Sequence, residues 1–439
     1  MSNQIVTENV SQVVAAAPST LQSTGAMISQ GGTNTTPGTK TLLTQPSDLT
    51  PILAATKALT SLTWSANVVT ATTTVPHGWT NGDVVLATVA GALPAPYNGT
   101  FSITVTGAST FTYPLVGNPG SSPASPSGTV ILADKAEILA MATTFFAQGK
   151  TQAVYVLELG EGTAAEGVTA LAAYITANPA TFYSYLVPAE WAAEATYLTF
   201  LANFESTTSK TYFFTTASTG NYTGYTTDMK CAVVFVPAPD APATEFGCAA
   251  LFYVALNYKP SSTNRVTPYA FSFLFGVTAW PEANNQTTLA SLKAAFVNYA
   301  ASGAEGGISN VILKWGTTKD GRQFTYWYSV DWVQINVQLA IANEVINGSN
   351  NPLAPLYYDQ PGINRLQARA QATVNAGISF GLVVGPAPVT AVPFAAYIAA
   401  NPSGYQAGAY NGLAVEYSPT KGFLAIVFDI VVSDLPIAA

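Results

Sequence analysis

Between residues 133 and 258 the chain alternates short, almost wholly apolar segments with longer segments of helical character. Strands are expected at 153–159, 182–187, 211–215 and 232–236, and helices at 136–146, 164–176, 189–204 and 244–256. Strands that are apolar on both faces must be covered on both faces, and alternation with helices is typical of a parallel or mixed sheet. The pattern predicts an α/β fold class, within a larger chain of mixed α+β, multidomain character.

The segment before it, residues 58–132, has a different character. β-Branched runs such as Val68–Val75 and Val84–Val89 are separated by turns containing Asn-Gly and Pro. Such spacing predicts short antiparallel strands. We therefore expect a small, self-contained all-β domain. The only histidine, His77, falls in a Pro-His-Gly turn of this domain, where a structural role is expected.

The remaining sequence is divided into three regions. Residues 1–57 are expected to form an N-terminal arm and part of the core, with a short helix near Pro51–Lys57. Residues 133–309 make the α/β domain, which includes a helix near Leu289–Tyr299. Residues 310–439 make a C-terminal core and assembly domain.

The C-terminal region shows two amphipathic helices. Asp331 is expected to cap the first, with Gln334 three residues later and Gly348 after its end. One face of this helix carries Trp332, Ile335, Leu339, Ala342 and Ile346. The second helix, 361–376, places Ile363, Leu366, Ala370 and Val374 on one face and stops at Gly377.

A hairpin is predicted to close the chain, with Tyr410–Tyr417 as its first strand and a turn at Ser418–Gly422. Its second strand, Phe423–Val432, is apolar on both faces apart from Asp429. Such a strand needs cover on both sides.

Charged residues make up only 9% of the 439 residues, hydrophobic residues 49%, and the net charge is −8. Without clustered Lys and Arg a nucleic-acid surface is not expected. Membrane insertion is not expected either. The best uncharged apolar stretch, 378–400, is interrupted by glycines and prolines, and the first ten residues lack the pattern of a signal peptide. The low charge fits either a monomer with an uncharged polar surface or a chain buried among other subunits.

Residue types that carry chemistry are scarce. Cys231 and Cys248 are expected to be free thiols of a reducing compartment, too few for a zinc site. The run Gly377-Ile378-Ser379-Phe380-Gly381 matches the G-x-S-x-G pattern of serine hydrolases, but a helix precedes it and no histidine follows it. Nucleotide-binding glycine motifs are also missing. We expect no enzyme, no catalytic or metal-binding residue and no cofactor.

Three runs in the C-terminal region carry a resemblance to a known family. They are Trp315-Gly-Thr-Thr-Lys-Asp-Gly-Arg322, Tyr328-Ser-Val-Asp-Trp332, and Leu356-Tyr-Tyr-Asp-Gln-Pro-Gly-Ile363. With the helices that follow and a closing strand that ends at Asp434-Leu-Pro436, their order resembles the tail sheath proteins of contractile-tailed bacteriophages. The all-β segment resembles small domains inserted on the outer surface of phage structural proteins.

This resemblance implies a structural subunit that polymerises helically around a tail tube and contracts to drive the tube through the host envelope. The implied partners are further copies of the chain, the tail tube protein, and the baseplate and tail terminator proteins. The implied location is the virion, after synthesis in the host bacterial cytoplasm. The alternatives are another virion structural protein, such as a tail tube or capsid component, or the sheath of a phage-derived injection system.

In such a sheath the terminal strands of one subunit join the sheet of the next. The assembly residues expected on this basis are Ile5, Val6, Val10, Leu424, Ile426, Phe428, Ile430 and Val432.

Overall fold

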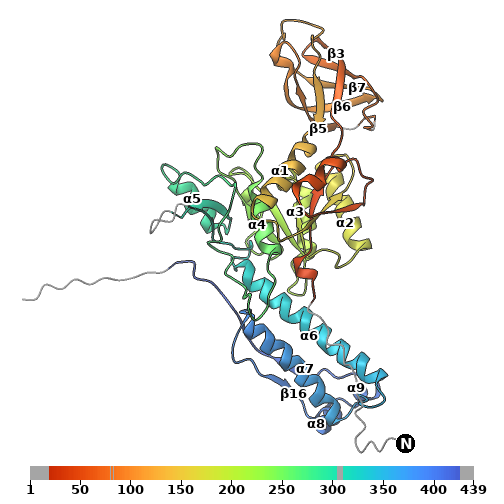
Figure 1. The fold of residues 1–439 in the computed structure, drawn as a ribbon, viewed down its shortest axis with the longest axis vertical. Helices are drawn as coiled ribbons and strands as arrows, with labels where there is room; N and C mark the ends of the chain where they lie inside the picture. Colours follow the sequence, from red (N-terminus) through yellow and green to blue (C-terminus); the bar gives the residue numbers. More distant parts are fainter. Residues whose placement is uncertain (1–18, 80, 83, 304–309, 426–439) are drawn as a thin grey trace, which may run out of the picture.

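The computed structural model describes residues 19–79, 81–82, 84–303 and 310–425. The molecule is elongated (Figure 1). A β-barrel forms one end, a helix-covered sheet forms the middle, and a pair of long helices with short strands forms the other end. Mixed helix and sheet in a multidomain chain is the predicted fold class.

The middle part is built on a six-stranded sheet with the order β12-β11-β10-β1-β9-β2. Its strands are β1 (Gly25–Ser29), β2 (Lys40–Leu43), β9 (Val154–Glu158), β10 (Ser184–Leu186), β11 (Tyr212–Thr216) and β12 (Ala232–Phe235). All neighbours pair in parallel except β2, which runs antiparallel to β9. The four strands predicted from apolar runs, β9 to β12, are confirmed.

The central strand β1 comes from the segment expected to be an arm. It pairs with β10 on one side and β9 on the other, and all five of its residues are buried. Only one short apolar run, Ala26-Met27-Ile28, marks it in the sequence. The first strand of the sheet is therefore separated from the second parallel strand by more than a hundred residues, most of which form the barrel.

Helices cover both faces of the sheet. On one face α1 (Ala133–Ala147) and α4 (Gly247–Leu256) pack over Met27 and Val156. On the other, α2 (Ala164–Ala177) and α3 (Ala195–Leu201) pack over Ile28 and Leu157. Successive side chains of one strand therefore point into the hydrophobic cores on opposite faces of the sheet. The helix predicted at 189–204 is broken into η4 (Ala189–Ala193), α3 and η5 (Ala202–Phe204).

The segment from Lys57 to Leu132 closes into a barrel with the order β3-β4-β7-β6-β5-β8. Its strands are β3 (Lys57–Ser65), β4 (Val68–Thr73), β5 (Val84–Ala90), β6 (Gly99–Gly107), β7 (Thr110–Pro114) and β8 (Thr129–Leu132). His77 is buried and stacks on Trp79, with 4.5 Å between ring centroids. Its burial lowers the pKa of His77. Between Lys57 and Asp134 the sequence has a single charged residue, Asp83.

Two helices expected in connecting segments have other bounds in the structure, and the first of them is a 3-10 helix. The helix expected near Pro51–Lys57 is the 3-10 helix η2 (Pro46–Ile52), and Lys57 already opens β3. The helix expected near Leu289–Tyr299 is α5 (Gln286–Ala294), whereas Tyr299 opens β13 (Tyr299–Ser302), which pairs with β14 (Val311–Lys314). The remaining short 3-10 helices are η1 (Leu21–Ser23), η3 (Ala95–Tyr97) and η6 (Tyr222–Gly224).

The two long helices at the other end are α6 (Phe324–Asn350) and α7 (Gln360–Ser379). Asp331 does not cap α6, since the helix begins seven residues earlier with Gln323 at its N-cap, and Gly348 lies inside it. Gly377 also lies inside its helix, because α7 continues to Ser379. The apolar face predicted for α7 is confirmed, with Ile363, Ala370 and Val374 buried.

Short strands and helices complete this end. The strand β15 (Val383–Val384) pairs with β18 (Ser418–Pro419), and β16 (Val389–Ala391) pairs with β17 (Leu413–Val415). Between β16 and β17 lie α8 (Phe394–Ala400) and α9 (Pro402–Gln406). The first strand of the predicted terminal hairpin is thus paired with β16, and the predicted turn contains β18. Most of the second strand lies outside the described residues.

Candidate functional site

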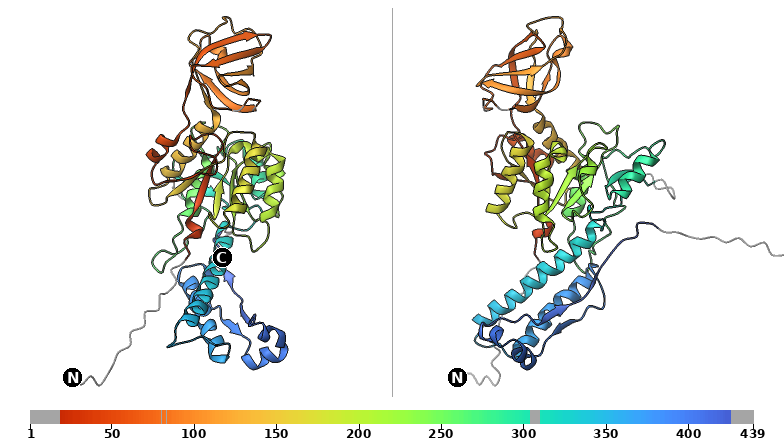
Figure 2. Two further views of the ribbon diagram at one scale, coloured as in Figure 1. Left: turned by 90° about the vertical axis from the view of Figure 1, so that its right-hand side faces the viewer. Right: turned by 180° about the vertical axis from the view of Figure 1, so that it is seen from behind.

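The helix α6 connects the sheet domain with the two-helix end of the molecule (Figure 2). Its 27 residues span about 40 Å at 1.5 Å per residue. Its first turns carry the buried aromatic residues Phe324 and Tyr328. The ring of Phe324 packs against Tyr212 of the sheet domain, and the ring of Tyr328 packs against Tyr183. The second half leaves that domain and packs against α7.

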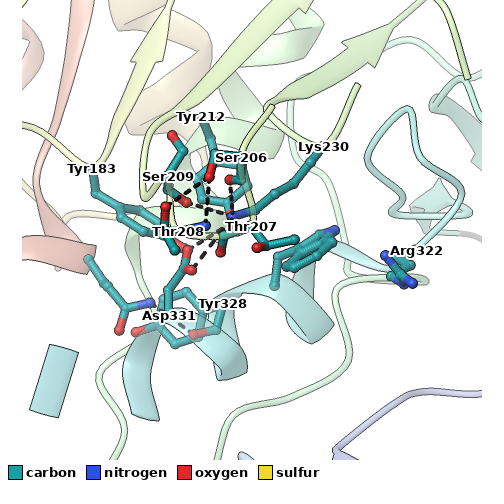
Figure 3. A network of polar contacts seen from close by, with 12 residues as sticks. Tyr183, Ser206, Thr207, Thr208, Ser209, Tyr212, Lys230, Arg322, Tyr328 and Asp331 are labelled. Carbon is teal, nitrogen blue, oxygen red and sulfur yellow. Dashed lines mark hydrogen bonds and ion pairs between the residues drawn. The ribbon is translucent and has the colours of Figure 1, made fainter. Parts of the chain in front are cut away.

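A buried carboxylate fixes α6 to the sheet (Figure 3). Asp331 is 0% exposed, and its Oδ2 accepts hydrogen bonds from the hydroxyls of Tyr183 at 2.9 Å and Tyr212 at 2.8 Å. Tyr183 directly precedes β10, and Tyr212 opens β11. One oxygen of the helix therefore holds the beginnings of two neighbouring strands.

The counter-charge of Asp331 is Lys230, which is 3% exposed. Its Nζ lies 3.9 Å from Asp331 Oδ1, donates to the carbonyl oxygen of Ser209 at 2.6 Å, and lies 4.5 Å from the ring centroid of Trp327. Burial lowers the pKa of Lys230, and the nearby Asp331 opposes this effect. Burial raises the pKa of Asp331 to about 6, against the effects of Lys230 and the two tyrosines. We call Asp331, Lys230, Tyr183 and Tyr212 the α6 joint.

A second charged cluster holds α6 to α7. Glu344 on α6 accepts from Arg365 Nη2 at 2.5 Å and from Arg369 Nε at 2.6 Å. Arg365 also donates to the carbonyl oxygens of Ala354 and Pro355, which lie in the loop between the helices. Burial would raise the pKa of Glu344, but hydrogen bonds and charges from Arg369 and Arg365 outweigh it, so the pKa of Glu344 is lowered.

The two ends of the described chain are both bound to α6 by amide side chains. Asn336 Oδ1 accepts from the backbone N–H of Ser19 at 3.0 Å. Gln323 donates to the carbonyl oxygen of Gly422 at 2.7 Å and accepts from its N–H at 2.8 Å. A Cβ at Gly422 would lie 2.5 Å from Cβ of Pro268, so this position requires glycine. The two terminal segments therefore depart from fixed points on the same helix.

Of the predicted assembly residues only Leu424 is described, two residues beyond the Gly422 anchor and half-buried. Ile5, Val6, Val10, Ile426, Phe428, Ile430 and Val432 lie outside the described residues. Sequence reasoning missed Lys230, Gln323, Asn336 and Glu344. Their partners are distant in the chain, so no local pattern could have found them.

The residue patterns considered for catalysis have ordinary structural surroundings. Ser379 is the last residue of α7, and its hydroxyl donates to Ala376 O, while the single histidine, His77, lies in the barrel. Cys231 and Cys248 are buried free thiols, and burial raises the pKa of each. Within the described ranges no group of His, Cys, Asp or Glu side chains could hold a metal ion. None of the helices described is long and apolar enough to cross a membrane.

The sequence and the fold were compared with those of known proteins. No family model matches the sequence, and no curated protein matches it. Solved structures do match, and they show that the chain has the fold of contractile sheath proteins.

One of these matches is a chain of the cryo-EM structure of the anti-feeding prophage baseplate. It has a TM-score of 0.57 and 13% identity and covers 99% of both chains. Another is a chain of the helical sheath of the anti-feeding prophage in its contracted state, with a TM-score of 0.53, 11% identity and 98% of both chains covered. At these identities the likeness concerns the fold, which is the sheath-type fold that the sequence resemblance implied.

Proposed function

We propose that this chain is the structural subunit of a contractile tail sheath, which polymerises helically around a tail tube and contracts to drive the tube through a host envelope. The observation that carries the proposal is the likeness in fold to the contracted sheath of the anti-feeding prophage, which covers 98% of this chain. The low charge of the sequence supports it, because surfaces buried among copies carry few charges.

The proposed assembly device is the exchange of terminal strands. Ile5, Val6 and Val10 of the N-terminal segment and residues 424–432 of the C-terminal strand would pair with sheets of neighbouring subunits. Departure of both segments from anchored points on α6 suits this role, because fixed exit points direct the arms. The barrel would lie on the outer surface of the sheath, and the chain would be part of the virion after synthesis in the host bacterial cytoplasm.

The energetics require both arms. Burying five large apolar side chains of the C-terminal strand is worth about 8–15 kcal/mol as a gross upper bound. Association costs on the order of 4–15 kcal/mol in lost freedom. One donated strand therefore only about breaks even, and a stable lattice needs the second arm as well. The tail tube, baseplate and tail terminator proteins are the further proposed partners.

Assembly of the purified chain tests the proposal. Truncation after Gly422 is expected to leave a folded monomer that no longer forms tubes in electron micrographs. Truncation after Asp434 is the matched control, because it keeps the whole apolar strand and should still assemble. Equal assembly of both truncated chains would refute strand exchange, and absence of any polymer from the full chain would refute the sheath. A sheath of a phage-derived injection system is the second candidate, favoured by the likeness to the anti-feeding prophage.

A further inference from the structure

The single histidine of the chain lies in a segment that covers one end of the barrel. This segment, residues 76–79, follows β4, and we call it the latch. The backbone N–H of His77 donates to the carbonyl oxygen of Ala108, in the turn between β6 and β7, at 3.0 Å. Trp79 is 7% exposed and belongs to the barrel core, where its ring centroid lies 5.6 Å from that of Phe111.

The latch lies at the end of the barrel that is joined to the sheet domain. Just before it, the N–H of Thr74 donates to the carbonyl oxygen of Ala58 in the first turn of β3 at 2.9 Å. Here β3 pairs with β8 through Lys57 and Val130. Since β8 ends at Leu132 and α1 begins at the next residue, a change in the latch takes place beside this joint.

A hydrogen bond inside the latch fixes the protonation state of the imidazole. The backbone N–H of Trp79 donates to Nδ1 of His77 at 3.1 Å. Because a backbone N–H can only donate, Nδ1 must be an acceptor, and the proton of the neutral ring is on Nε2. Protonation of Nδ1 would turn two donors toward each other. The closed latch and the imidazolium therefore exclude one another.

The surroundings of the ring also disfavour a charge. His77 is 3% exposed and stacks on Trp79. In the part of the chain that the structure describes, its Nε2 has no hydrogen-bond partner. A charge placed on this ring would be buried without an acceptor to compensate for the lost water.

The groups that act on the imidazole leave its pKa lowered. Burial of His77 is the largest cause, and the positive charge of Lys57 on β3 acts in the same direction. The backbone carbonyl groups of Thr110 and Gly107 oppose both effects without outweighing them.

Three other charged residues belong to this region of the chain. Asp134 and Lys135 lie in the first turn of α1, where burial raises the pKa of Asp134 and Lys135 donates to the hydroxyl of Thr56 at 3.2 Å. Asp83 lies outside the described residues. A carboxylate close to the imidazole would raise the pKa of His77, and the titration of His77 itself reports any such effect.

We propose that the latch is an acid-sensitive switch, in which protonation of His77 releases residues 76–79 from the end of the barrel beside the sheet domain. An open latch frees Nδ1 from the N–H of Trp79 and exposes the ring to water, so it can hold the charge. The switch is built into the barrel itself and does not depend on assembly with other copies.

The sign of the pH dependence follows from the lowered pKa. The open latch binds a proton with an ordinary pKa of about 6.5, and the closed latch binds it less tightly. The closed form is therefore fully favoured above pH 6.5 and loses stability as the pH falls. Down to the pKa of the closed form, the ratio of closed to open latch falls about tenfold per pH unit. Asp331 in the sheet domain has the opposite dependence, so the readout must be local to the barrel.

Titration of the ring in the full-length wild type is the first test. Because His77 is the single histidine, deuterium exchange at its ring carbon Cε1, followed by mass spectrometry between pH 5 and pH 8, gives one midpoint. A midpoint below 6.5 supports the proposal. A midpoint at or above 6.5 would overturn it, and this result needs no variant that folds.

The second test measures the opening itself. Amide hydrogen exchange is followed on peptides that contain residues 76–79, in the wild type and in His77→Asn, whose side-chain oxygen can accept from the N–H of Trp79 but does not titrate. Relative to the variant, the wild type should open up to about tenfold more per pH unit below pH 6.5. Peptides of β9 are the control and should show the same pH dependence in both chains. An equal pH dependence of the latch in both chains would overturn the proposal.

Discussion

Replacing Asp331 by Asn tests the α6 joint through its pH dependence. Because burial raises the pKa of Asp331 to about 6 from an ordinary value of 3.8, the folded chain holds this proton more tightly than the unfolded chain does. The stability that Asp331 contributes is therefore full below about pH 4 and is lost as the pH rises to about 6. Each pH unit between the two pKa values is worth about 1.4 kcal/mol, so ionisation of the buried carboxyl costs about 3 kcal/mol.

The amide introduced by Asp331→Asn keeps a carbonyl oxygen that can accept from Tyr183 and Tyr212 but does not ionise. We expect the difference in unfolding free energy between this variant and the wild type to move by about 3 kcal/mol in favour of the variant between pH 4 and pH 7. Asp331→Ala is the contrasting variant. It leaves two tyrosine hydroxyls without their acceptor and Lys230 without its counter-charge. Its free energy of unfolding should therefore be about 3–5 kcal/mol lower than that of the wild type at neutral pH.

Urea unfolding at a series of pH values measures both effects. Trp327 and Trp332 flank the joint on α6, so tryptophan fluorescence reports its loss. A difference between wild type and Asp331→Asn that stays constant from pH 4 to pH 7 would refute the reasoning. If the wild type instead became more stable relative to Asp331→Asn as the pH rises, the effect of Lys230 would outweigh that of burial, and the pKa of Asp331 would be low.

Three further predictions concern the second ion-pair cluster, the C-terminal anchor and the barrel. Glu344→Gln should lower the free energy of unfolding by only about 1 kcal/mol at neutral pH, because the partner arginines are partly exposed. This loss should vanish as the pH falls through the lowered pKa of Glu344, and urea unfolding at pH 7 and pH 3 checks it. In Gly422→Ala the added methyl group should clash with Pro268, so less polymer should sediment while the melting temperature changes little. Unchanged assembly would show that the contact between Gln323 and Gly422 does not direct the C-terminal strand. Replacing residues 58–131 by a short Gly-Ser linker should leave assembly intact, because Lys57 and Val130 are paired neighbours in the barrel; loss of folding would show that the barrel supports the sheet domain.

Helices and strands are predictable from the sequence where apolar residues recur at a regular spacing. They are not where an element is held by residues far away in the chain. The strands β9 to β12 are apolar on both faces, and α7 repeats apolar residues at helical spacing, so both were predicted. By contrast β1 is central to the sheet, yet only three apolar residues mark it. Its position depends on pairing with strands more than a hundred residues away.

The start of α6 shows the same limit. Asp331 followed by Gln334 fits a capping pattern, but the carboxylate accepts from tyrosines of two strands and the helix begins at Phe324. The aromatic residues before Asp331 pack into the core of another domain, which overrides the local signal. Helical spacing in the sequence puts Ile335, Leu339 and Ile346 on one face of α6, whereas the exposure of Ile346 depends on the placement of α7 on the other face.

The most direct test of the central claim is a helical reconstruction, by electron cryomicroscopy, of polymers formed by the purified full-length chain. The account predicts a hollow tube with the barrel on its outer surface and with the strand that contains Leu424 paired to a sheet of the adjacent subunit. A chain that stays a monodisperse monomer under every assembly condition would contradict the claim. So would a closed shell, or a tube whose subunits meet without exchanged strands.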